Sequence, residues 1–456
     1  MLELNELTTR LVREFVASGY LPNFEKLYRQ SYIYNTDAGE SGLNLNPWIQ
    51  WFTVHSGLPF EEHQVYLLGE GYSNDIPTLG NIISDSGFTV ALFGSMNVGF
   101  KNPLNGLAKP DAWADGVNAY PDTLEPFRKF VQSQVQEHTN PEFKPSLKNY
   151  IEFGSFMIRH GLSSGTVIGI IKQLIAEKFT GDTWKRPFVL DALQWNTFSH
   201  LYSKHKPEFA TFFSNSVAHT QHTHWREFEP DPFDVKPSQE DVRKYGDAIR
   251  KAYIANDRLI GNALSLVDSE TTLIFCTALS QRPALEWESE GGKMFYRPYD
   301  IDGFCRFLGI ESEITCRPVM AEEFWIEFKS DKDLELGLAI LEGAKLGNER
   351  LMKTYPREGG IYSGCRLHMP IADDAQIVTH DGRSAPVRSH LYKSQDVKSG
   401  MHDRSGMLWI SLPNREHKVL DANPVPLETI APTILTLLEI APLSSMRADP
   451  LPEIIH

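Results

Sequence analysis

Short apolar runs alternate with amphipathic stretches along most of the chain, which predicts strands separated by helices. Apolar residues dominate Leu2–Leu4, Phe88–Gly94, Phe209–Phe213, Thr272–Thr277 and Leu408–Leu412. Runs of this length are typical of strands that are buried on both faces of a sheet. Helices between such strands favour an α/β fold with a mostly parallel central sheet and helices on both faces.

The stretches between these runs carry apolar residues at helical spacing, and several of them begin with a proline in the first turn, where a helix tolerates it. A glycine follows the end of some of them, as is common after a helix. Helices are expected at about Thr8–Ser18, from Pro22, over Asn46–Gly57, Pro77–Ser86 and Thr166–Phe179, as one long helix over Glu240–Ser265, and over Thr429–Ile440.

The pattern changes between residues 296 and 395. Phe324–Phe328 alternates like a half-exposed strand, Asp331–Ala344 is amphipathic, and glycines and polar turns cluster between Gly347 and Arg383. We interpret 296–395 as an inserted, smaller α+β subdomain or lid. Residues 1–295 and 396–456 would then form the α/β core.

Composition narrows the partners. The 456 residues carry a formal net charge of −15, so we expect binding neither to nucleic acid nor to an anionic membrane. The four cysteines are far apart and indicate reduced thiols, and the acidic N-terminal segment has no signal-peptide pattern, so we expect a cytoplasmic protein. A local site for one small anionic substrate stays compatible with this charge.

The richest candidate segment is TFFSNSVAHTQHTHWR, which follows the apolar run at Phe209–Phe213. Ligands collect beyond the carboxyl ends of strands in open α/β sheets. If the segment is helical, His219 and His222 share one face and His224 points elsewhere. Imidazoles are common ligands for zinc. We expect His219 as a metal ligand and His222 as the next candidate; the alternative is a solvated histidine cluster that only makes hydrogen bonds.

A second candidate is His402, in the segment SGMHDRSGMLWISLP. It is expected in a glycine-bounded loop directly before a strand, from where its ring can reach the sheet edge. A lone histidine in a loop is usually solvated. His402 is therefore a candidate metal ligand only in combination with the histidines of the first segment. Asp403 and Arg404, next to it, are interpreted as a surface salt bridge rather than as site residues.

Four segments, taken in order, resemble the alkaline-phosphatase superfamily and are nearest to its type I phosphodiesterase and nucleotide-pyrophosphatase branch. They are LELNELTTRLVREFVASGYLPNFEKL at the N-terminus, WFTVHSGLPFEEHQV, NSVAHTQHTHW, and MHDRSGMLWI with the later IAPTILTLLEIAP. The third segment resembles a D-x-x-x-H metal pair, with Asn215 and His219 in those places. The fourth places His402 where the family has its last metal histidine. The resemblance covers about the first 100 residues, 187–285 and 395–445.

The resemblance implies two metals that activate a Ser or Thr nucleophile, and the chain departs from this pattern. The nucleophile position falls on Pro47, between Asn46 and Trp48, and none of these can attack phosphorus. Asn46 is kept as a candidate catalytic residue, together with Gln50 and His55 on the same predicted helix, where they can approach a substrate. For His55, a structural role is the alternative.

The implied metal ligands depart as well. The family's first aspartate falls on Asn5, which is kept as a candidate catalytic residue. The family's paired aspartate and histidine fall on Ala278 and Leu279. The second metal site is therefore lost, whereas the first retains Asn215, His219 and His402, with His222 as an extra ligand. Glu6, beside Asn5, is a possible base, with a role at the helix N-terminus as the alternative.

These departures lead to one functional prediction with two alternatives. We expect a hydrolase or group transferase that acts on a small phosphate, phosphonate or sulfate ester through water activated by one divalent metal, zinc before others. The alternatives are a degenerate, non-hydrolytic ligand-binding protein and a repurposed biosynthetic enzyme. A homodimer is compatible with the sequence but not specified by it.

Overall fold

The computed structural model describes residues 1–114, 116–137, 146–319, 322–395 and 397–455. Within them, a nine-stranded sheet has the order β20-β2-β19-β6-β1-β5-β3-β4, and β21 also pairs with β2. The strands are β1 (Leu2–Leu4), β2 (Tyr32–Asp37), β3 (Val90–Phe93), β4 (Gly106–Lys109), β5 (Phe209–Ser214), β6 (Leu273–Cys276), β19 (Ser405–Ser411), β20 (Lys418–Val419) and β21 (Val425–Pro426).

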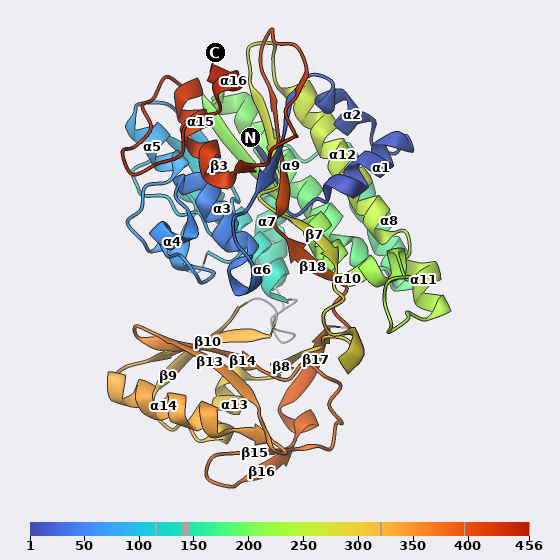
Figure 1. Ribbon diagram of the computed structural model, residues 1–456, viewed down its shortest axis with the longest axis vertical. Helices are drawn as coiled ribbons and strands as arrows, with labels where there is room; N and C mark the ends of the chain where they lie inside the picture. The colour runs from blue at the N-terminus through green and yellow to red at the C-terminus, as the bar shows by residue number, and fades with distance from the viewer. Residues whose placement is uncertain (115, 138–145, 320–321, 396, 456) are drawn as a thin grey trace.

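All neighbouring pairs in this sheet are parallel except those of β19, which runs antiparallel to β2 and β6. The predicted α/β class with a mostly parallel sheet is therefore confirmed. The carboxyl ends of β1, β5 and β6 meet at one edge of the sheet, because these three strands are parallel neighbours. This edge lies toward the lower half of the molecule in Figure 1, near α10, β7 and β18.

Helices cover both faces (Figure 1). One face carries α1 (Thr9–Ala17), α2 (Pro22–Tyr28), α6 (Glu125–Glu137), α7 (Leu147–Arg159), α8 (Ser164–Thr180), α9 (Arg186–His205), α10 (Ser216–Phe228), α11 (Gln239–Tyr245) and α12 (Ala248–Leu266), and the other carries α3 (Pro47–Ser56), α4 (Phe60–His63), α5 (Leu79–Asp85), α15 (Ile430–Leu437) and α16 (Pro452–Ile455). Short 3₁₀ turns are η1 (Gly42–Asn44), η2 (Glu70–Tyr72), η3 (Asp122–Leu124), η4 (Thr183–Lys185), η5 (Glu288–Glu290), η6 (Val387–Ser389) and η7 (Leu427–Thr429).

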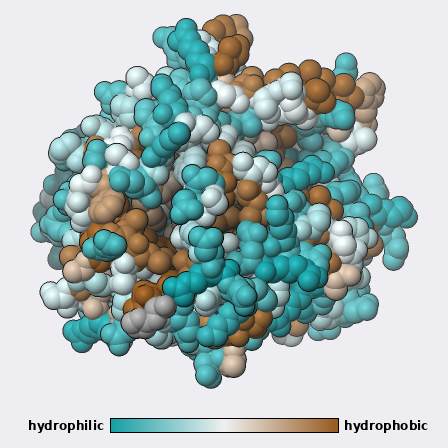
Figure 2. Space-filling view, turned by 90° about the horizontal axis from the view of Figure 1, so that it is seen from above, coloured by the Kyte–Doolittle hydropathy of each residue, from teal (hydrophilic) through white to brown (hydrophobic). Residues whose placement is uncertain are grey.

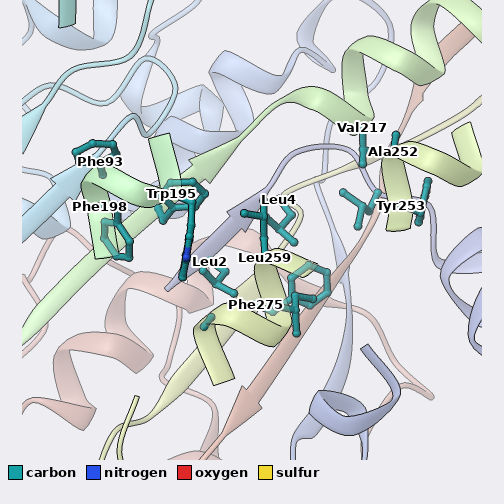
Figure 3. Packing of buried hydrophobic residues seen from close by; sticks show 14 of the residues in the cluster. Leu2, Leu4, Phe93, Trp195, Phe198, Val217, Ala252, Tyr253, Leu259 and Phe275 are labelled. Atoms are coloured by element: carbon teal, nitrogen blue, oxygen red, sulfur yellow. The ribbon is translucent and has the colours of Figure 1, made fainter. Parts of the chain in front are cut away.

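Strand alternation divides the core between the two faces. Leu2 and Leu4 point to the first face, where Figure 3 shows them near Phe275 and Leu259. Glu3 lies between them in sequence, so its side chain points to the opposite face, toward α3. A charged residue is thus fully buried in the central strand.

Residues 295–395 form sheets of their own below the core (Figure 1). These elements are β8 (Phe295–Pro298), α13 (Ile301–Leu308), β9 (Ile314–Pro318), β10 (Glu323–Phe328), α14 (Asp331–Gly343), β11 (Lys345–Leu346), β12 (Glu349–Arg350), β13 (Met352–Arg357), β14 (Gly360–Cys365), β15 (Gln376–Val378), β16 (Ser384–Pro386) and β17 (Leu391–Gln395). They share a separate hydrophobic cluster. One link to the core is the Tyr362 hydroxyl, which donates to the Leu68 carbonyl at 2.9 Å. We keep the domain limits 1–295, 296–395 and 396–456 as a proposal that this clustering supports.

Three expectations from the sequence need correction. The predicted helix over Glu240–Ser265 is two helices, because α11 ends at Tyr245 and α12 begins only at Ala248, after a turn at Gly246 and Asp247. His402 lies not in a loop but in β18 (Gly400–Asp403), which pairs antiparallel with β7 (Ser280–Pro283). Strands β2 and β4 were not anticipated.

The surface agrees with a folded globular chain. At the end of the core away from residues 295–395, hydrophilic residues prevail and apolar residues form separate patches (Figure 2). In the described part of the chain, none of the helices combines the length and the apolar character needed to cross a bilayer.

Candidate metal centre

Three side chains from distant parts of the chain meet at the carboxyl edge of the sheet: Glu6, His222 and His402. Their ligand atoms all lie within 4.8 Å of one another. Glu6 Oε2 is 3.1 Å from His222 Nε2 and 3.6 Å from His402 Nε2. The two imidazole rings are edge to face, with centroids 5.0 Å apart.

Each residue is fixed by the element that carries it. Glu6 follows β1 directly and has φ 62°, in the left-handed region that non-glycine residues seldom adopt. His222 lies in the middle of α10, which starts at the carboxyl end of β5. His402 lies in β18, opposite Gln281 of β7. A strained backbone at Glu6 is consistent with a functional position.

The tautomer of His222 indicates a positive charge in this cluster. Its Nδ1 lies 3.0 Å from the Gly400 carbonyl oxygen, which can only accept, so Nδ1 carries a proton. In a neutral ring, Nε2 would then present a lone pair to the Glu6 carboxylate at 3.1 Å. Two acceptors at this distance repel each other unless a proton or a metal ion lies between them. The arrangement therefore favours a cation at this point.

Electrostatics put two of the ligands in the binding form. Burial alone would raise the pKa of the Glu6 carboxyl, but the His402 and His222 imidazoles and hydrogen bonds from His222 and Gln281 outweigh burial and lower it to about 2. Burial lowers the pKa of His402 to about 3, against the opposing effect of Glu6. At neutral pH the carboxylate is ionised and His402 is neutral, and metal ligands need these forms.

The donor set fits a zinc-like ion. Ligand atoms about 2.0–2.2 Å from a tetrahedral zinc lie about 3.4 Å apart, close to the 3.1 and 3.6 Å separations from the Glu6 oxygen. Two imidazoles and one carboxylate leave a fourth position open, as in catalytic zinc sites. Glu6 is 2% exposed at its side chain, whereas His222 is 28% exposed, so the cluster is accessible from one side.

A buried hydrogen-bond network supports the cluster from behind. The Gln281 amide donates to Glu6 Oε2 and, at 3.0 Å, to the Ala218 carbonyl. The Gln221 amide donates to the Glu6 carbonyl at 2.8 Å, and the Tyr253 hydroxyl donates to Gln221 at 2.8 Å. Such partners hold a ligand in one orientation.

The two asparagines predicted for the site lie beside Glu6. The Asn5 amide donates to Glu6 Oε1 and to Asn215 Oδ1, both at 2.8 Å, and Asn5 Oδ1 accepts from the Trp51 indole at 2.8 Å. The structure thus brings Asn5 and Asn215 together with Glu6. Ligation by Asn215 and catalysis by Asn5 stay predictions.

The other two histidines of α10 lie outside the three-residue group. His219 precedes His222 by nearly one turn and is partly exposed, and its role as a ligand stays a prediction. His224 sits at a kink of α10, where its ring stacks on Tyr245 with centroids 4.5 Å apart.

The three catalytic candidates near α3 have structural contacts. The Asn46 amide donates to the Leu43 carbonyl at 2.8 Å, and the buried Gln50 amide donates to the Asn44 carbonyl at 2.9 Å. His55 is 1% exposed and lies 2.9 Å from Glu3. Contact of any of them with a substrate remains a prediction.

The positions where the resemblance implies the second metal are apolar. Ala278 and Leu279 are fully buried, and among the described residues no second group of three His, Cys, Asp or Glu ligands lies at such close spacing. Reasoning from sequence left Glu6 as a secondary candidate and did not include Gln281. The only sequence signal for Glu6 was its place beside Asn5, directly after a strand.

No protein-family model matches the chain, and no curated protein matches it in sequence. In structure it is similar to wild-type alkaline phosphatase PafA, at 11% identity over 100% of this chain and 98% of that chain, with a TM-score of 0.48. It is also similar to phosphonoacetate hydrolase from Sinorhizobium meliloti 1021 in complex with phosphonoacetate, at 9% identity over 94% and 93% of the two chains, with a TM-score of 0.39.

A third similar structure is murine ectonucleotide pyrophosphatase/phosphodiesterase 5, at 11% identity over 97% of this chain and 95% of that chain, with a TM-score of 0.39. Because identity and TM-scores are low, we base no functional conclusion on these structures.

Proposed function

We propose that the chain is a hydrolase that holds one divalent metal, zinc before others, through Glu6, His222 and His402, and cleaves a phosphate, phosphonate or sulfate ester. The observation that carries this proposal is the convergence of one carboxylate and two imidazoles from distant parts of the chain, with ligand atoms that all lie within 4.8 Å of one another. The ester class follows from the sequence resemblance.

The chain's own residues have distinct tasks in this proposal. Glu6 and the two imidazoles bind the ion, Gln281 and Asn5 fix the Glu6 carboxylate, and the Gly400 carbonyl fixes the His222 ring. A metal bound there would supply positive charge that polarises an ester oxygen and makes water more acidic. The position where the resemblance implies a nucleophile holds Pro47, between Asn46 and Trp48, so we propose water as the attacking group.

Metal analysis tests the proposal. Purified protein loaded with zinc and desalted is expected to retain about one ion per chain, measured by inductively coupled plasma mass spectrometry. His222→Ala and His402→Ala are expected to lose it, whereas His205→Ala, on the exposed end of α9, is a matched control that retains it. His219→Ala decides the prediction for that residue: loss of zinc makes it a ligand.

Turnover is then measured with p-nitrophenyl phosphate, bis-p-nitrophenyl phosphate and p-nitrophenyl sulfate. Hydrolysis of one of them that is lost in His402→Ala and retained in His205→Ala supports the hydrolase. Zinc bound without any turnover would instead support the alternative, a ligand-binding protein without hydrolytic activity. Absence of zinc binding in the unchanged chain would overturn the metal site itself.

A further inference from the structure

Two lysines lie on the paired segments that connect the core with residues 295–395. The Lys398 amide donates to the Lys293 carbonyl at 2.8 Å, so the two residues are neighbours across the two connecting segments. Both ammonium groups lie near the ring of Phe295, at 5.1 Å for Lys293 and 5.9 Å for Lys398. Lys293 is also 4.7 Å from the Trp287 ring.

These ammonium groups have aromatic neighbours but no partner of opposite charge. Within the described ranges, neither forms an ion pair or a side-chain hydrogen bond. Glu322 and Glu323, the acidic residues on β10 and just before it, are already paired with Lys353 at 2.9 and 2.6 Å. Burial disfavours both charges, and this outweighs the attraction of the carboxylates within electrostatic reach, among them Glu322 and Glu286, so that the pKa of each lysine is lowered. An anion between the two ammonium groups would therefore stabilise the site.

Lys398 lies on the segment that leads into the metal cluster. Lys398 is four residues before His402, on the chain that continues into β18, and β18 and β7 lie against α10 (Figure 1). Burial and the charge of Lys293 lower the pKa of Lys398 to about 8, and Glu6 acts on it in the opposite direction. Lys398 in turn lowers the pKa of His402. The ammonium is therefore within electrostatic reach of the proposed metal ligands.

We infer that Lys293 and Lys398 form a subsite for a second anionic group of the substrate, a carboxylate or a phosphate, joined by a short linker to the ester group at Glu6, His222 and His402. This inference rests on the proposed function and narrows its substrate class to esters or phosphonates with at least two anionic groups. Lys293 and Lys398 are binding residues in it, because they touch substrate away from the bond that breaks.

Calorimetric titration of the zinc-loaded full chain tests the subsite with two probes. Ethylphosphonate carries one anionic group, and 3-phosphonopropionate carries the same phosphonate and a carboxylate. The unchanged chain is expected to bind the second probe about tenfold to a hundredfold more tightly, because charge-assisted hydrogen bonds contribute this much. Lys293→Met and Lys398→Met, which retain the apolar stem, are expected to lose most of this preference and to retain zinc.

Lys204→Met, on the exposed end of α9, is the matched control and is expected to keep the preference, as is Lys398→Arg. Equal affinity for both probes in the zinc-loaded chain would overturn the subsite and leave the metal site standing. If zinc does not bind, the proposed function fails, and the subsite is judged in metal-free protein. There, pyrophosphate is expected to slow acetylation of Lys293 and Lys398 but not of Lys204, measured by peptide mass spectrometry; unchanged acetylation rates would overturn it.

Discussion

Strand β1 and the turn after it carry two glutamate–histidine pairs with opposite properties. Glu3 and His55 lie 2.9 Å apart and are 0% and 1% exposed. Glu6 and His222 lie 3.1 Å apart, but the His222 ring is 28% exposed and His402 approaches the same carboxylate. Both pairs consist of the same two groups, a carboxylate and an imidazole. The second pair has a third potential ligand and an exposed side, so it can act as a site. The first pair has neither and is part of the core.

The two pairs also differ in how many of their polar atoms have a hydrogen-bond partner. In the closed pair, His55 Nδ1 and Glu3 Oε2 have no hydrogen-bond partner among the described residues. In the open pair, Nδ1 of His222 and both carboxylate oxygens of Glu6 have partners. The open pair is thus held in one orientation from several sides, as a ligand set requires.

The largest expected effect comes from breaking the closed pair. Glu3→Ala is expected to lower the free energy of unfolding by about 3–5 kcal/mol, because it leaves a buried imidazole without its partner. Urea denaturation measures this change, and zinc content should stay unchanged. Glu14→Ala, in the exposed pair with Arg10, is the control with little effect. A loss below about 1 kcal/mol for Glu3→Ala would show that the pair is not closed.

A buried histidine without a carboxylate tests the role of burial. His63 accepts from the Val65 amide at 3.0 Å, and burial lowers its pKa to about 4. The unfolded chain binds a proton near pH 6.5, so stability is full above that pH and falls as the pH drops toward 4. Between pH 7 and 4.5 the loss is expected to be about 2–3 kcal/mol.

The variant His63→Asn separates this effect from the other groups that titrate in the same range. Its unfolding free energy is measured by urea denaturation at pH 7 and at pH 4.5. The loss between these two pH values should be smaller than in the unchanged chain by about 2–3 kcal/mol. Parallel curves for the two proteins would contradict the assignment to His63.

The open pair can be weakened without touching a ligand. Gln281→Leu removes the amide that donates to Glu6 Oε2 and is expected to reduce zinc affinity about 10- to 100-fold. Competition with a chromophoric chelator measures the affinity. Unchanged affinity would mean that the carboxylate is held by Asn5 alone.

The smallest effect is expected at an exposed ion pair close to His402. Arg404 Nε lies 2.6 Å from Asp37, with side chains 53% and 35% exposed. Arg404→Ala is expected to change the unfolding free energy by about 0.5 kcal/mol or less, since water screens the pair. The difference should vanish in 1 M salt; a larger, salt-independent loss would indicate a packing role for the arginine.

The sequence predicted the central fold well because its signals are local. The apolar runs that became β3, β5 and β6 and the proline-initiated helices α2 and α3 need no tertiary information. The break between α11 and α12 was missed because a single glycine, here Gly246, is often tolerated within an amphipathic helix. Strand β4 was missed because its sequence, GLAK, begins with a glycine and ends with a lysine and therefore does not form an apolar run.

At the site, residues that lie next to a predicted core strand were easier to identify from the sequence than residues whose proximity depends on the fold. His222 and His402 follow or precede core strands, and both reach the cluster. Glu6 needed the geometry of β1, and Lys293 and Lys398 needed the pairing of two segments that are about 100 residues apart in sequence. No spacing rule connects such residues, because their meeting depends on how residues 295–395 enter and leave the core.

The entry and exit of residues 295–395 have a consequence for the evolution and engineering of this protein. Strands β8 and β17 are paired, with Leu391 opposite Pro298, so the segment begins and ends at one place. A graft of a foreign module at these two points would need no rearrangement of β7, β18 or α10. Exchange of this segment would therefore leave the residues that are proposed to hold the ion in place.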